Sequence, residues 1–169
     1  ALYAVTAFNA TRVLVLDFDA HSGGGTWNII QRSMPENVVQ IDVTTSRLDT
    51  WTPAGESILM YSDVEDYRQT IREAIEYAKT LKPFDLVIYN GGMDPINDGV
   101  LEDVISYRER AVLDFIGDTP AIFALAGETI GCRLLADLQH IDRKALCFAQ
   151  NGSTACVVSD ANEQQGWIK

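Results

Sequence analysis

Arg12-Val-Leu-Val-Leu-Asp-Phe-Asp-Ala-His-Ser-Gly-Gly-Gly-Thr26 is the stretch that decides the fold. Its apolar run at residues 13–16 is too short for a helix and has no polar alternation, which is typical of a strand buried on both faces of a parallel sheet. The run ends in Asp17, Asp19 and His21, followed by three glycines. Open α/β sheets bind ligands beyond the carboxyl ends of their strands. The stretch therefore predicts a strand that delivers polar side chains to a ligand site.

Short apolar runs alternate with longer stretches of helical periodicity along the rest of the chain. Further strands are expected at residues 38–43, 58–61, 84–89 and 120–125. Helices are expected at residues 2–10, 26–33, 63–81, 101–115 and 130–138. Asn151-Gly152, between apolar runs at 145–150 and 154–158, is a strong hairpin signal. The pattern predicts a single α/β domain over residues 1–169, with a mostly parallel sheet, helices on both faces and an antiparallel C-terminal hairpin.

Charge and cysteine content narrow the classes of partner and compartment. The 169 residues include 24 acidic and 13 basic side chains, for a net charge of -11. Nucleic acid and anionic membranes would repel such a chain, so we expect neither as a partner. Three cysteines without a Cys-x-x-Cys pair indicate a reducing compartment, the cytoplasm. The sequence shows no basic-flanked signal peptide and no apolar run of about 18 residues.

Polar side chains follow three of the expected strands, at Asp17-Phe-Asp-Ala-His21, Asp42 and Asn90-Gly-Gly-Met-Asp94. If these strands are parallel neighbours, their carboxyl ends converge on one cleft. Asp19, His21 and Asp94 then form an oxygen, nitrogen and oxygen ligand set, which suits Zn²⁺ or another divalent metal and leaves a position open for water. Such a metal lowers the pKa of bound water to about 7 and polarises a carbonyl, as metal-assisted hydrolysis requires.

The segments Leu14-Val-Leu-Asp-Phe-Asp-Ala-His-Ser-Gly-Gly-Gly-Thr26 and Asp85-Leu-Val-Ile-Tyr-Asn-Gly-Gly-Met-Asp94 resemble the histone deacetylase and acetylpolyamine amidohydrolase family. The resemblance covers most of residues 1–130, about half of a family domain, and implies the arginase-like α/β fold. It also implies that Asp19, His21 and Asp94 bind a catalytic zinc.

The resemblance places two further groups of residues around this metal. Asp17 and groups near Asp42 are implied at a nearby monovalent-cation site or as supports of the metal ligands. The cleft is expected to be lined by Ser22, Gly23, Gly24 and Gly92.

The chain departs from the family at the positions that transfer protons. The family's histidine pair precedes the first strand, and this chain begins too late to contain it, so the N-terminal part of a family domain is lacking. Ser22 and Gly24 stand where family members carry a histidine and an Asp or Asn. The family's tyrosine falls near residues 125–129, where Glu128 is the nearest polar candidate for a catalytic role. A carboxylate donates to an oxyanion only when it is protonated.

Three functions from different classes follow, and whether the protein is an enzyme stays open. The first is a zinc-dependent amidohydrolase acting on small acetylated amines. The second is a catalytically inactive protein of the deacetylase fold that serves as a binding or assembly module. The third is a haloacid dehalogenase-type phosphatase, with Asp17 as nucleophile and Asp19 as acid and base. Half a family domain leaves apolar surface uncovered, so a homodimer is expected.

Overall fold

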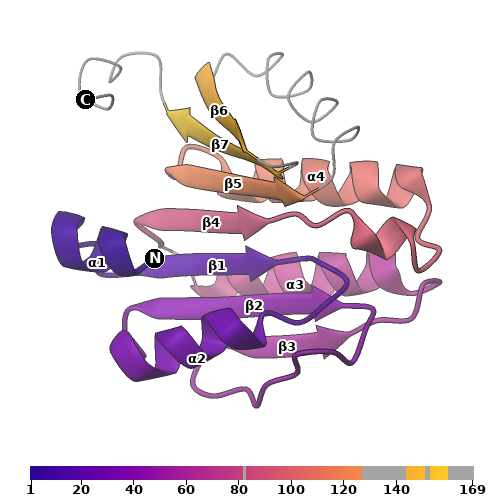
Figure 1. The fold of residues 1–169 in the computed structure, drawn as a ribbon, viewed down its shortest axis with the longest axis horizontal. Coiled ribbons are helices and arrows are strands. Elements are labelled where there is room, and N and C mark those ends of the chain that lie inside the picture. Colours follow the sequence, from indigo (N-terminus) through magenta and orange to yellow (C-terminus); the bar gives the residue numbers. More distant parts are fainter. Residues whose placement is uncertain (82, 127–143, 151–152, 160–169) are drawn as a thin grey trace.

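The structure is a computed structural model that describes residues 1–81, 83–126, 144–150 and 153–159 (Figure 1). Its strands are β1 (Val13–Asp17), β2 (Val38–Thr44), β3 (Ile58–Tyr61), β4 (Leu86–Asn90), β5 (Ala121–Ala126), β6 (Lys144–Gln150) and β7 (Ser153–Ser159). Its helices are α1 (Leu2–Phe8), α2 (Gly24–Ser33), α3 (Tyr67–Leu81), α4 (Glu102–Ile116) and the 3-10 helix η1 (Asp94–Ile96).

The seven strands among the described residues join one sheet in the order β3-β2-β1-β4-β5-β7-β6. The first five pair in parallel, and β7 runs antiparallel to both β5 and β6. Along the chain, β2 pairs beside β1 and β3 pairs beside β2, on one side of β1. The next strand, β4, pairs with β1 on its other side. This order reverses between β1 and β4, which makes their carboxyl ends the switch point of the sheet. The predicted mostly parallel sheet and antiparallel C-terminal pair are confirmed.

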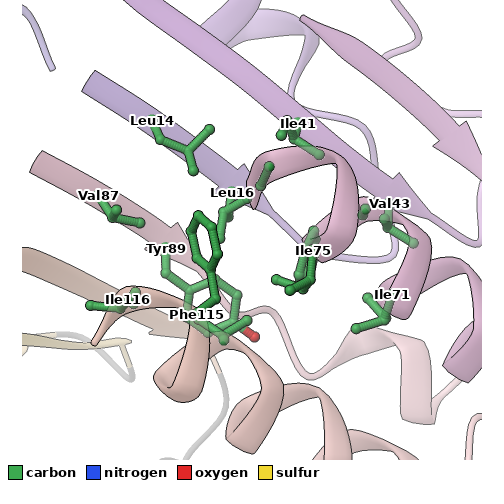
Figure 2. Close-up of a cluster of buried hydrophobic side chains, with 14 of the residues drawn as sticks. Leu14, Leu16, Ile41, Val43, Ile71, Ile75, Val87, Tyr89, Phe115 and Ile116 are labelled. Atoms are coloured by element: carbon green, nitrogen blue, oxygen red, sulfur yellow. The ribbon is translucent and has the colours of Figure 1, made fainter. Parts of the chain in front are cut away.

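Helices cover both faces of the sheet because alternate residues of its central strands are apolar on both sides. Leu14 and Leu16 of β1 pack in a cluster with α3 and α4, while Val13 and Val15 pack with α1 and α2. Figure 1 shows α2 in front of the sheet and α3 and α4 behind it. Figure 2 shows the larger cluster, in which strand residues meet Ile71 and Ile75 of α3 and Phe115 and Ile116 of α4.

Among the element boundaries that differ from the prediction, one is explained by a local turn and one by a contact with a distant segment. Residues 63–66 form a turn in which the Asp63 carbonyl accepts from the Asp66 amide at 3.2 Å, so α3 begins only at Tyr67. Ahead of β4, the Asp85 carboxylate accepts hydrogen bonds from the Thr11 and Arg12 amides at 2.7 and 3.0 Å. These hydrogen bonds hold Asp85 just before the strand, which starts at Leu86.

Two predictions fall outside the described residues, namely the helix at 130–138 and the candidate catalytic residue Glu128. Within the described part of the chain, no helix is both long enough and apolar enough to cross a bilayer.

Candidate functional site

Asp19, His21 and Asp94 come together at the switch point of the sheet. The His21 amide donates to Asp19 Oδ1 at 2.9 Å, and the His21 ring places Nδ1 3.2 Å from Asp19 Oδ1 and 3.5 Å from Asp94 Oδ2. One potential ligand atom from each residue lies within 4.8 Å of the others. The side chains of His21 and Asp94 are 45% and 46% exposed, whereas that of Asp19 is 16% exposed. Two carboxylates and an imidazole thus face solvent where the strand order reverses.

Glycine at position 92 allows the two loops of this site to touch. A Cβ atom at Gly92 would overlap the carboxylate of Asp19. The loop after β4 therefore lies directly against the Asp19 side chain, and this close approach brings Asp94 within reach of His21.

The glycines after β1 form a tight turn into α2. The Gly23 amide donates to Asp42 Oδ2 at 2.8 Å, and a Cβ atom at Gly24 would meet the backbone of Asp49. Trp51 closes over this turn, because its indole Nε1 donates to Asp42 Oδ2 at 2.6 Å and its ring stacks on Trp27 with centroids 4.3 Å apart. The predicted lining residues Ser22, Gly23, Gly24 and Gly92 thus lie in closely packed turns.

A buried polar stripe lies beneath the glycine turn. In β2, the odd-numbered residues from Val39 to Val43 join the apolar core, while Gln40 and Asp42 are fully buried on the other face. Gln40 Nε2 donates to Asp42 and to the Gly23 carbonyl, and Asn90 Nδ2 donates to Asp17 Oδ1 at 2.8 Å. These contacts tie the ends of β1, β2 and β4 to one another.

Burial makes ionisation of these acids unfavourable. Burial and the nearby charge of Asp42 raise the pKa of Asp17 to about 7, although the hydrogen bond from Asn90 opposes the shift. Burial also raises the pKa of Asp42, against the effect of its donors Trp51, Gln40 and Gly23. Among the described residues, Gln40 Oε1 and Ser22 Oγ are buried without a hydrogen-bond partner. A monovalent cation at Asp17 and Asp42 stays a prediction.

Residues that the sequence analysis passed over also contribute to the site. Arg108 and Glu109 of α4 are buried, and Arg108 Nη1 donates to the carbonyl oxygens of Phe18 and Gly92. A signal was present, because Ile105, Arg108, Glu109 and Val112 follow the spacing of the buried helical stripe. Charged residues at such positions indicate buried pairing and not a solvated face.

No protein-family model and no curated protein matches the chain. Among solved structures it is similar to a ribosomal RNA methyltransferase from Plasmodium falciparum, at 10% identity over 94% of this chain and 93% of that one, with a TM-score of 0.54. Human methyltransferase-like protein 13 in complex with SAH is similar at 14% identity over 90% and 74%, with a TM-score of 0.52. The HD domain of HDA15 is similar at 19% identity over 80% and 45%, with a TM-score of 0.54.

At these identities the similarities show the fold, an α/β architecture with a parallel sheet. Because the similar structures are mainly methyltransferases, the identification with the deacetylase family, and with it the arginase-like assignment, is wrong on this comparison. The zinc-dependent amidohydrolase, the inactive deacetylase-fold module and the dehalogenase-type phosphatase are corrected with it. The prediction of Zn²⁺ as the cofactor is corrected as well, since two of the similar structures were solved with SAH.

The physical reason for the error lies in the shortness of the motif. A buried strand that ends in carboxylates and a glycine turn serves any open α/β sheet whose first helix starts close to the sheet edge. Such a stretch therefore predicts architecture and the place of the site, whereas the chemistry depends on side chains from elsewhere in the fold.

The role of Asp19, His21 and Asp94 as metal ligands stays a prediction, because it rests on their geometry. With Mn²⁺ as the probe, we expect one ion per chain, and at least tenfold weaker binding after His21→Ala, since a ligand is lost. Calorimetric titration measures the number of Mn²⁺ ions bound per chain and their affinity. Asp98→Asn, an exposed acid outside the cluster, is the matched control. Equal Mn²⁺ affinity in wild type and His21→Ala contradicts the prediction.

Asp17 makes stability depend on pH. Because its pKa rises from 3.8 in the unfolded chain to about 7 in the fold, its contribution is fully present below pH 4 and is lost as the pH rises to about 7. The loss corresponds to about 4 kcal/mol. Asp17→Asn keeps an acceptor for Asn90 and removes the titration. Urea unfolding from pH 4 to 8 should show a decline in wild type that is smaller in the variant, and parallel profiles contradict this prediction.

Gly92→Ala tests the contact between the two loops. The added Cβ displaces the Asp19 carboxylate, so we expect a loss of about 1–3 kcal/mol in unfolding free energy. A shift of the His21 ring resonances in NMR spectra should accompany the loss. Gly25→Ala is the control, because a Cβ there meets no atom within 4 Å. If the two variants are equally stable and leave His21 unchanged, the loops are not held together at Gly92.

Proposed function

We propose that the protein is a methyltransferase that binds S-adenosylmethionine at the carboxyl edge of its sheet and methylates a small-molecule acceptor. The observation that carries the proposal is the convergence of Asp19, His21 and Asp94 on the switch point between β1 and β4. Ligands of open α/β sheets bind at this point. The methyltransferases among the similar structures, two of them in complex with SAH, support this class of ligand.

The glycine turn offers a place for the nucleoside part of the donor. Gly25, in the first turn of α2, is the open position, because a Cβ atom there would meet no atom within 4 Å and the backbone can be approached by a ligand. Asp42, at the end of β2, is fully buried and accepts from Gly23, Gln40 and Trp51. We therefore assign Asp42 to holding the turn and not to binding the ribose.

Electrostatics favours the charged donor over the neutral product. S-adenosylmethionine carries a positive sulfonium, which SAH lacks. The chain has a net charge of -11, and Asp19 and Asp94 lie at the site. Acidic groups at the mouth of a site raise the local concentration of a cation. This attraction weakens as salt is added, because salt screens the charges.

His21 is suited to accept the proton of the acceptor. Without a bound ion, the tautomer with the proton on Nδ1 directs that proton at Asp19 and Asp94 and leaves Nε2 as the basic nitrogen. The acceptor nitrogen or oxygen forms a bond to the methyl carbon while the bond from sulfur to that carbon breaks, and sulfur keeps the electron pair. The acceptor's proton moves to His21 Nε2, and SAH leaves. General-base catalysis of this kind contributes about 10²–10⁴-fold in rate.

Further expectations belong to the same proposal. The protein is a single cytoplasmic domain without a nucleic-acid or membrane partner, and it forms a homodimer. Exposed apolar residues of α1 support a self-contact, since Leu2, Tyr3 and Phe8 are 46%, 72% and 54% exposed.

Calorimetry with S-adenosylmethionine and SAH tests the proposal. We expect saturable binding at one site, with the affinity for S-adenosylmethionine falling more steeply with salt than that for SAH. His21→Gln should keep SAH binding and lose about 100-fold or more of the SAH production with a panel of small amines and phenols. Asp98→Asn is the control for surface charge. If neither compound binds at millimolar concentration, the proposal is wrong.

A further inference from the structure

Arg108 of α4 is fully buried and reaches both loops of the candidate site. Its Nη1 donates to the carbonyl oxygen of Phe18 at 2.8 Å and to that of Gly92 at 2.9 Å. Phe18 precedes Asp19 in the chain, and Gly92 lies two residues before Asp94. One nitrogen therefore joins the backbones of the two segments that carry the polar cluster.

Neighbouring side chains fix the plane of the guanidinium. Glu109 Oε1 accepts from Arg108 Nε at 2.8 Å and from Nη2 at 2.5 Å, and it also accepts from the Tyr89 hydroxyl at 2.7 Å. The Tyr67 hydroxyl donates to the same Phe18 carbonyl at 3.2 Å. Glu109 balances the buried charge, and the fork geometry of arginine directs its remaining donors to the loops.

We propose that Arg108 is the positioning residue of this site, holding the loops after β1 and β4 in the arrangement that brings Asp19, His21 and Asp94 together. Two carbonyls from different loops require two donors at set directions inside the fold, because a buried carbonyl without a partner is costly. A lysine keeps the charge, but its single ammonium nitrogen cannot replace Nε and Nη2, which bind Glu109, together with Nη1, which binds the two carbonyls. Arg108 thus acts on the site through the backbone and touches no ligand.

Arg108→Lys and Val112→Ala form the matched pair for the test. Both change a buried side chain on the same stripe of α4, but Val112 is apolar and cannot bind the carbonyls of Phe18 and Gly92. We expect amide hydrogen exchange at Phe18 and Gly91 to rise at least tenfold in Arg108→Lys and by less than twofold in Val112→Ala, at a temperature where both are folded. The Phe18 amide donates to the Asn90 carbonyl, and the Gly91 amide donates to the Ala124 carbonyl. Both amides therefore lie next to the carbonyls that Arg108 binds. Equal exchange in the two variants overturns the proposal.

Ligand affinity is the second readout and rests on the proposed function. Arg108→Lys should weaken SAH binding at least tenfold, and Val112→Ala should leave it within about twofold at a temperature where both are folded. If wild type does not bind SAH, the proposed function fails, while the exchange rates still decide the role of Arg108. If Arg108→Lys opens the loops without weakening SAH, the positioning role is overturned.

Native-state amide hydrogen exchange of the wild-type protein tests the positioning role of Arg108 if Arg108→Lys does not fold. If Arg108 holds both loops to α4, the amides of Phe18 and Gly91 exchange with the same denaturant dependence as the amides in the centre of α4. Exchange at Phe18 and Gly91 that is independent of denaturant, while α4 stays protected, overturns the proposal.

Discussion

The pairing of β1 with β2 on one side and β4 on the other is the constraint on which the site depends. Parallel strands end at the same edge, so this pairing brings Asp17, Asp42 and Asn90 into register across three strands. The loops that continue from β1 and β4 then start side by side. Gly92 lets them touch, and Arg108 binds a carbonyl from each. Asp19, His21 and Asp94 meet because of these backbone arrangements.

The same edge carries an unusual amount of buried polarity for a small sheet. Gln40, Asp42 and Arg108 are fully buried, and Asp17 is nearly so. Each makes hydrogen bonds within the fold, yet the pKa values of Asp17 and Asp42 remain raised, which shows that desolvation outweighs the donors they receive. Residues that lower stability tend to persist where a site needs them. The polar stripe below the glycine turn therefore supports the location of the site at this edge.

Fold and chemistry separate clearly in this protein. An open sheet with a switch point, a glycine turn and carboxylates at strand ends is compatible with many reactions, because the scaffold sets only where ligands bind. The deacetylase interpretation attached one chemistry to a short motif, whereas the similar structures are mainly methyltransferases and share the fold with this chain. Imidazole and carboxylates at a switch point suit proton transfer, which several classes of reaction require.

The sequence by itself determined the alternation of strands and helices, the parallel core, the C-terminal antiparallel pair and the grouping of Asp19, His21 and Asp94. These follow from local periodicity and from the rule that parallel strands end together. Only the tertiary structure decided that Arg108 lies inside the fold and that the Trp51 indole donates to Asp42. Arg108 acts through contacts with segments far away in the chain, and Trp51 acts through a hydrogen bond across its own loop to Asp42 and through stacking on Trp27. Such contacts leave no periodic trace in the sequence beyond the burial of the stripe on which Arg108 lies.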